Sequence, residues 1–425
     1  MQFRLLFRHR GIMATASAAA AVAIAGGVIA AVTPPKTHEA MSSAANSQPN
    51  GQQGTGSTAG QQPAGQGKPA APAKPLVPLQ VVSVTPADGG KDANGAAPVK
   101  ITFNEAVAAS TPMPAVSPKI SGTWSVSGDA ITFQPSLGWK PGTHVTVTIP
   151  GGKTGIQAAG LASRGTTTTA ATDIGLLAKS ASVSYTTGSY STLRLEQLLT
   201  RLGYLPLTWT SADPAAPAIP DASTNAQMSA AYAPPAGSFA FQSGYPWQLT
   251  SQWKAGQDNV LDKGAIMAFQ SDNGLTMDGV AGPDFWSHLF QAVGQDKQNP
   301  NGYTYSLADQ HSPERLRVWH NGQQILSTLV NTGVPGAGTQ DGTFPVYLRY
   351  KVTEMKGTNP DHTKYDDIVR WVSYFNGGDA LHYFPRPGYG YYQSVGCVEM
   401  QLDPAKYIWR YTTYGSLVTV TGPEA

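Results

Sequence analysis

The sequence contains a single cysteine, Cys397, and the residues around it have types suited to nucleophilic catalysis. Gly396 precedes it, and a glycine there lets the backbone approach a substrate and direct N–H groups at a developing oxyanion. His382 lies fifteen residues upstream, before the turn "PRPGYG", so two adjacent segments can bring an imidazole beside the thiol. An imidazole in that place can take the thiol proton and hold a reactive thiolate.

A lone cysteine in a chain that leaves the cytoplasm has three interpretations. It can be a buried small hydrophobic residue, the partner of a cysteine in another chain, or a nucleophile. A histidine near a cysteine also arises by chance, so the residues alone leave all three interpretations open.

Composition narrows the possible functions. The length of 425 residues predicts two to four domains. The formal net charge is only +2, which gives no electrostatic reason to expect nucleic acid as a partner. The eight histidines show no metal-ligand spacing, and one cysteine cannot build a thiolate cage, so we expect neither a metal nor another cofactor.

The N-terminal region has the composition of an export segment followed by a linker. Residues 1–32 combine Arg4, Arg8 and Arg10 with an uncharged, Ala-rich run, which predicts a secretory signal or an N-terminal membrane anchor. No sharp cleavage site distinguishes the two. Residues 33–74 are rich in Pro, Gly, Gln and Ala and predict a disordered linker. The rest of the chain is therefore expected outside the cytoplasm, in or near the cell wall.

Residues 75–187 have a β pattern. Short β-branched runs such as "APVKITF" and "GTHVTVTI" end at Pro, Gly, Asn or Asp, which predicts an antiparallel β-sandwich. The stretch "TPADGGKDANGAAPVKITFNEAV" resembles bacterial immunoglobulin-like modules. We see no clustered chemistry in this block, and the resemblance implies a spacer or docking module.

Residues 190–294 have a helical pattern. "LRLEQLLTRLGY" places four leucines on one helix face before Gly203. Asp262 is expected to cap a second helix that ends at Asn273-Gly274, and Pro283 to begin a third.

The order of these helices, with "AIMAFQSDNGLTMDGVAGPDFW", resembles the three-helix peptidoglycan-binding domain. The chain departs from that family by an insertion at about 206–253. This departure affects the binding surface rather than the helical core.

Residues 313–422 return to β signals. "RLRVWHNGQQILSTLVNT" predicts a hairpin with a type I′ turn at Asn321-Gly322, and "GSLVTVTG" predicts a last strand. The segment 351–379 shows few strand signals, and a long irregular segment in a compact domain is often an active-site cover. Its Tyr365, Trp371 and Tyr374 are candidates for a substrate groove, and packing in the core or cover is an equal alternative.

Three ordered motifs in the last quarter of the chain resemble the L,D-transpeptidase catalytic domain, often called YkuD-like. They are the Gly-Pro-Gly-x-x-Thr type segment at 333–344, then His382, then Ser394, Gly396 and Cys397 as Ser-x-Gly-Cys. The predicted fold class is therefore multidomain: an immunoglobulin-like β-sandwich, a small three-helix domain and a mainly-β catalytic domain.

The resemblance implies a cysteine acyltransferase that joins peptidoglycan stem peptides. Cys397 would attack the carbonyl before a terminal D-Ala, with His382 as base and the Tyr383 carbonyl fixing the imidazole tautomer. Backbone N–H groups of Gly396 and Cys397 would stabilise the oxyanion. A second stem would then take the acyl group in a 3→3 cross-link. The resemblance also implies inhibition by carbapenem β-lactams and requires no cofactor.

Some positions differ from the family pattern. Val395 stands where many members have His, and Tyr383 stands where many have Gly or Ser after the catalytic His. Glu399 stands where Arg or Asn is common. Two alternatives remain open at this point. One is a cysteine L,D-carboxypeptidase or endopeptidase that passes the thioester to water, and the other is a non-catalytic wall-binding surface protein.

Overall fold

The structure, a computed structural model, describes residues 77–162, 174–213 and 224–422. The predicted export segment 1–32 and linker 33–74 lie outside the described residues. Within the described ranges, no helix has both the length and the apolar character needed to cross a membrane.

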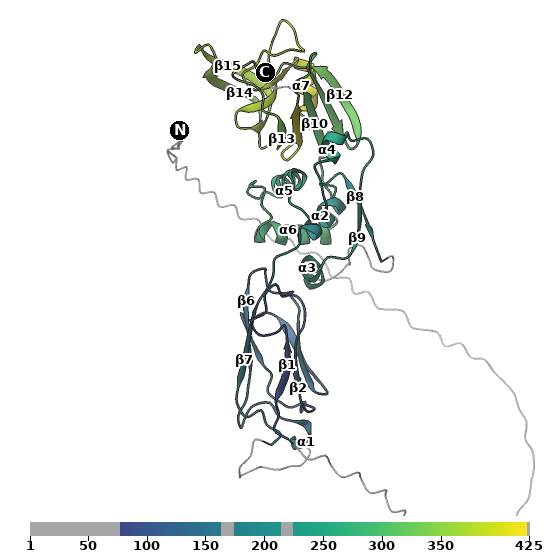
Figure 1. The fold of residues 1–425 in the computed structure, drawn as a ribbon, viewed down its shortest axis with the longest axis vertical. Helices are drawn as coiled ribbons and strands as arrows, with labels where there is room; N and C mark the ends of the chain where they lie inside the picture. The colour runs from purple at the N-terminus through teal and green to yellow at the C-terminus, as the bar shows by residue number, and fades with distance from the viewer. Residues whose placement is uncertain (1–76, 163–173, 214–223, 423–425) are drawn as a thin grey trace, which may run out of the picture. The chain divides into compact units, whose positions relative to one another are not determined.

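The first block is a β-sandwich of two antiparallel sheets (Figure 1). One sheet has the order β1-β2-β5-β4, and the other has the order β3-β6-β7. Side chains of β2 alternate, so Val99, Ile101 and Phe103 are buried while Lys100 is exposed. This alternation is the pattern from which the sandwich was predicted. The bounds are β1 Val81–Thr85, β2 Val99–Phe103, β3 Ala115–Ser117, β4 Gly122–Ser127, β5 Ala130–Pro135, β6 His144–Ile149, α1 Ala159–Ala162 and β7 Ala181–Thr186.

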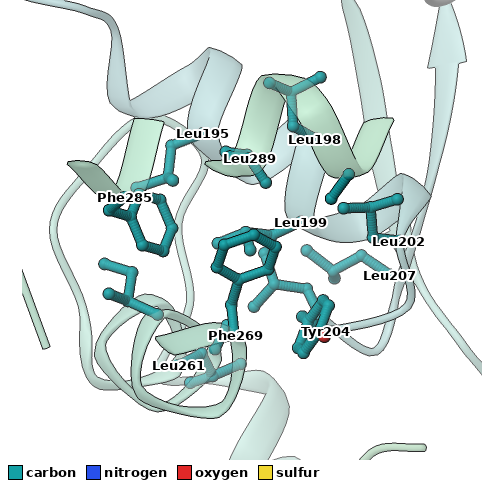
Figure 2. Packing of buried hydrophobic residues seen from close by; sticks show 14 of the residues in the cluster. Leu195, Leu198, Leu199, Leu202, Tyr204, Leu207, Leu261, Phe269, Phe285 and Leu289 are labelled. Carbon is teal, nitrogen blue, oxygen red and sulfur yellow. The ribbon is translucent and has the colours of Figure 1, made fainter. Parts of the chain in front are cut away.

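Three main helices form the second block, as expected: α2 (Thr192–Arg201), α5 (Val260–Asp272) and α6 (Pro283–Gly294). Figure 2 shows their apolar side chains meeting around Phe269, with Leu199 of α2 beside it and Leu195 of α2 near Phe285 of α6. Gly203 has φ +76°, and it follows the last turn of α2 as predicted.

The predicted cap of α5 is wrong. Asn259, not Asp262, is the N-cap, and its side-chain oxygen accepts hydrogen bonds from the N–H groups of Leu261 and Asp262. The Asn259 side-chain nitrogen also donates to the Asp262 carboxylate at 2.8 Å. Both residues have capping side chains, and in the structure Asp262 occupies the first turn instead of the cap.

The described parts of the insertion, residues 206–213 and 224–253, contain two strands and two short helices. β8 (Leu207–Ser211) and β9 (Gly237–Phe241) form a two-stranded antiparallel sheet. Two short helices, α3 (Thr224–Tyr232) and α4 (Trp247–Thr250), lie within the same insertion. Trp253 packs edge-on against Phe239, at a ring distance of 5.1 Å. The insertion therefore extends the apolar cluster of the helices.

The third block begins with a five-stranded sheet of order β12-β11-β10-β18-β13. Its central strand β10 (Thr304–Asp309) precedes residue 313, where the catalytic block was expected to start, and pairs in parallel with β18 (Leu417–Thr421). The predicted hairpin is confirmed: β11 (Arg315–His320) and β12 (Gln323–Leu329) flank Asn321-Gly322, both with positive φ. Strand β13 covers Gly342–Pro345.

A second sheet has the order β14-β15-β16-β17. The prediction of an irregular segment at 351–379 is wrong, because β14 (Leu348–Thr358) and β15 (Lys364–Asn376) form a long hairpin. Trp371 has φ +59° at an irregularity in the β15 pairing with β16, and this bulge breaks the alternation by which a strand is recognised. The sheet continues with β16 (Asp379–Tyr383) and β17 (Val398–Met400), and α7 (Leu402–Ile408) follows.

The two sheets enclose one apolar core. Val318, Phe375, Val398 and Val418 belong to it, and Ile408 of α7 packs into the same cluster. The opposite face of the second sheet carries a smaller cluster of Val369, Val372 and Ala380, against which Cys397 packs. The candidate nucleophile therefore lies on the outer face of a sheet whose inner face is fixed by the core.

The helical block and the catalytic block share a hydrophobic core. The cluster that contains Leu261 and Phe269 also contains Tyr305 and Leu417 of the catalytic sheet. One close approach between the two blocks joins two glycines: a Cβ on Gly264 of α5 would lie 2.6 Å from the carbonyl oxygen of Gly415. The helices are thus part of the support of the catalytic sheet.

This close approach predicts the effect of one methyl group. Gly264→Ala should lower the thermal midpoint of the full chain, with a loss of about 1–3 kcal/mol, because the Cβ overpacks against backbone that cannot move aside. Gly294→Ala is the matched control, since only the side chain of Gln227 lies within 4 Å of its added Cβ. It should be neutral or stabilising by up to about 1 kcal/mol, because alanine favours helix. Equal midpoints for the two variants, by calorimetry, would contradict the shared core.

Candidate active site

The parallel pairing of β16 with β17 brings the candidate base and nucleophile together. In this register Leu381 pairs with Val398, and His382 with Glu399. Leu381 and Val398 face the core, so the alternation of side chains turns Ala380 and His382 to the outer face. Cys397 directly precedes β17 and lies on the same face. Thiol and imidazole both line a pocket of about 180 Å³.

The thiol is held in its neutral form. Its sulfur lies 3.7 Å from the Gly378 carbonyl oxygen, to which the S–H donates. Burial raises the pKa of Cys397 to about 12, and the carboxylates of Asp379 and Glu399 act in the same direction, against a hydrogen bond from the backbone of Ala380. At neutral pH the resting side chain is therefore a thiol.

The imidazole is neutral as well. His382 is buried, which lowers its pKa, and its Nδ1 lies 3.0 Å from the Tyr383 carbonyl oxygen. The neutral ring donates from Nδ1 to this carbonyl, which leaves the Nε2 lone pair to accept a proton. This is the contact predicted for the Tyr383 carbonyl. Among the described residues, no hydrogen bond joins His382 to Cys397. The resting geometry thus differs from the predicted thiolate held by His382.

Gly396 can only be glycine. Its φ is +105°, and a Cβ there would lie 2.4 Å from Oδ1 of Asp379. Burial raises the pKa of that carboxyl to about 6. Within the described ranges, the N–H groups of Gly396 and Cys397 make no backbone hydrogen bond. They remain available to a substrate oxyanion.

Ser394 fixes the backbone of the nucleophile and does not line the pocket. It is fully buried, and its hydroxyl donates to the Cys397 carbonyl oxygen at 2.5 Å. Its own carbonyl oxygen accepts from the N–H of Val334, in the Gly-rich segment. That segment is tied in turn by Thr339, whose hydroxyl accepts from Gly333 at 2.9 Å. The Gly-rich segment 333–344 and the Ser-x-Gly-Cys motif at 394–397 are therefore one structural unit.

Asn331 was missed by the sequence analysis although it organises this unit. It is buried, and its backbone N–H and carbonyl both pair with Glu399. Its side chain donates to the Gly388 carbonyl oxygen and accepts from the Gly390 N–H. In the sequence, Asn331 directly follows the largely apolar run "ILSTLV", and this position could have marked it as a structural polar residue.

The ion pair of Arg386 with Glu399 was also missed. The guanidinium Nε and Nη2 lie 2.7 and 2.8 Å from the two carboxylate oxygens, a bidentate geometry. Glu399 is buried and lines the pocket together with Arg386. The departure from the family pattern at position 399 is thus matched by a cation within the turn "PRPGYG".

The structure separates the three groove candidates. Tyr365 lines the pocket, and Tyr374 packs in the apolar cluster of Cys397. Trp371 packs against Trp409, at a ring distance of 5.6 Å, on the core side of the sheet. At the bulge around Trp371, the side chains of β15 change from one face of the sheet to the other. The simple alternation of residues in the sequence therefore could not predict which candidates face the pocket.

Comparisons with known proteins agree with this architecture. Residues 304–420 match the family described as the L,D-transpeptidase catalytic domain, and residues 76–187 match the bacterial Ig-like domain. The chain therefore combines an Ig-like β-sandwich with an L,D-transpeptidase catalytic domain, and that domain implies an enzyme of this class. The helical region between them matches no peptidoglycan-binding family.

Solved structures give weaker likenesses. An L,D-transpeptidase from Mycobacterium smegmatis is 13% identical, with 81% of this chain and 100% of that chain covered, at a TM-score of 0.26. L,D-transpeptidase 3 from Mycobacterium tuberculosis with a faropenem-derived adduct is 12% identical over 80% and 98%, also at 0.26. The catalytic domain from E. faecium is 26% identical over 28% and 96%, again at 0.26. The search of the curated proteins gave no match.

The raised thiol pKa predicts a simple pH dependence. A thiolate fraction far below its pKa rises about tenfold per pH unit, so iodoacetamide should alkylate Cys397 progressively faster from pH 6 to 9. The single cysteine lets intact-protein mass spectrometry follow the reaction, with glutathione as reference. A rate that is already level below pH 7 would instead demonstrate a preformed thiolate.

Proposed function

We propose that this chain is a peptidoglycan L,D-transpeptidase that forms 3→3 cross-links between stem peptides through a thioester on Cys397. One observation carries the proposal: a neutral imidazole and a thiol share one face of a paired strand unit, beside two free N–H groups, within a domain of this family. The donor is a stem that ends in D-Ala, and the acceptor is the diamino acid of a second stem.

Acylation follows from the groups in the pocket. The Cys397 sulfur attacks the carbonyl carbon before the terminal D-Ala while its proton passes to Nε2 of His382. The N–H groups of Gly396 and Cys397 receive the negative charge on the carbonyl oxygen, a contribution that is typically about 3 kcal/mol for one donor. The imidazolium then protonates the leaving nitrogen. D-Ala departs, and the acyl group remains as a thioester.

Deacylation reverses the roles. The side-chain amine of the acceptor, in its neutral form, attacks the thioester carbon and gives a proton to His382. The C–S bond breaks, and the imidazolium returns the proton to sulfur. The products are the amide cross-link and the free thiol. Neither half-reaction calls for a metal or a cofactor.

The remaining partners follow from the same assignment. The neighbours in complex with imipenem and with a faropenem-derived adduct support the proposal that carbapenems and related β-lactams acylate Cys397. We also propose that the enzyme works outside the cytoplasm, in the cell wall. The helical block 190–294 retains the helix order of peptidoglycan-binding domains, and we propose that it contacts the wall polymer.

Incubation with purified tetrapeptide muropeptides tests the reaction. The full chain should release D-Ala and form dimers linked between two third residues, read by mass spectrometry. Cys397→Ala should abolish both while leaving the fold intact, because a small side chain in a half-buried position is replaced by a smaller one.

Two results would count against the proposal. Release of D-Ala without dimers would assign the enzyme to the hydrolytic alternative. Continued release by Cys397→Ala would remove Cys397 as nucleophile. Circular dichroism of the variant provides the control for folding.

A further inference from the structure

The pocket has a wall formed by one face of β15. Side chains of a strand alternate, and Tyr365, Asp367 and Val369 all line the pocket. The intervening Asp366 and Ile368 point away from it and are exposed. Asp366 forms an ion pair with Lys356 at 2.9 Å. Two successive aspartates thus lie on opposite faces of the same strand.

Two of the charges that line the pocket neutralise each other. Arg386 holds Glu399 in a bidentate pair and also donates to the Gln393 carbonyl oxygen at 3.0 Å. Its guanidinium lies 4.7 Å from the centre of the Phe384 ring. A guanidinium so engaged contributes little net charge to a ligand, because its partner carboxylate lines the same pocket.

Asp367 retains an uncompensated charge. It is half-buried and, among the described residues, its carboxylate forms no hydrogen bond or ion pair. Its carboxylate lies close enough to His382, Arg386 and Tyr365 to act on each electrostatically. The imidazole is neutral and the Arg386–Glu399 pair has no net charge, so the pocket carries one negative charge beside apolar Met355 and Val369. A carboxylate in such surroundings favours a cationic partner.

We propose that Asp367 binds the ammonium group of the acceptor stem, which makes the pocket a site for a primary alkylammonium. The inference rests on the proposed function and adds the residue that selects its second substrate. An alkylamine is protonated in neutral water, so the acceptor arrives as a cation. The carboxylate holds this cation in the pocket that Cys397 lines, and thereby favours aminolysis of the thioester over hydrolysis.

The proton balance of the step is complete. Ammonium and thioester become amide and thiol, with one proton left over, and that proton leaves to the solvent. Asp367 takes up no proton in this balance, so it positions the amine and does not act as its base. His382 remains the group that returns a proton to sulfur.

The test compares Asp367→Asn with Asp366→Asn in the full chain. Asparagine keeps the size and removes the charge in both, but only Asp367 faces the pocket. Asp367→Asn should still release D-Ala from the donor, because Cys397 and His382 are unchanged. Its KM for the acceptor stem should rise about fivefold or more, the effect expected for a partly exposed ion pair of about 1 kcal/mol, and more thioester should go to water. Asp366→Asn should match the parent.

A neutral nucleophile shows whether Asp367→Asn impairs only the binding of a cationic acceptor or also disturbs the structure of the site. Hydroxylamine is uncharged at neutral pH, so it should cleave the thioester of Asp367→Asn as fast as that of the parent. Equal losses with hydroxylamine and with the acceptor stem would overturn the inference, as would an acceptor KM that does not change. Both of these outcomes leave the proposed function standing. If the parent forms no dimers at all, the proposed function falls and the inference falls with it.

Discussion

The parallel pairing of β16 with β17 is the constraint on which the site depends. A strand has two faces, and here one face is committed to the core by Leu381 and Val398. The other face must then present His382 and the residues around Cys397 to the same pocket. A shift by one residue would bury the imidazole in the core and expose leucine instead. The catalytic geometry is therefore maintained by apolar packing on the far side of the sheet.

Around His382 and Cys397, most side-chain hydrogen bonds are made to backbone groups. Ser394 holds the Cys397 carbonyl, Tyr383 holds the imidazole, and Asn331 ties the turn at Gly388 to strand β17. The thiol and the imidazole both remain neutral because burial disfavours their charged forms. In the proposed mechanism, charge separation is thus confined to the moment of attack, when the substrate oxyanion would accept hydrogen bonds from two N–H groups.

The sequence predicted those features that are local or that depend on a regular period. The hairpin at Asn321-Gly322, the leucine face of α2 and the start of α6 at Pro283 are all such features, and the structure has them. Contacts between residues that are distant in the sequence could not be predicted from it. The bulge at Trp371 concealed β15, and the ion pair of Arg386 with Glu399 joins residues thirteen positions apart across a turn. The shared core of α5 with β18 joins two blocks that the sequence presented as separate.

The central claim is that Cys397 carries the acyl group within this pocket. The most direct measurement is intact-protein mass spectrometry after incubation with a tetrapeptide donor whose diamino acid amine is acetylated, so that no acceptor is present. The account predicts a mass gain equal to the donor minus D-Ala, mapped to the peptide that contains "SVGCVEM". D-Ala release with an adduct on any other residue, or with the terminal D-Ala still attached in the adduct, would contradict it.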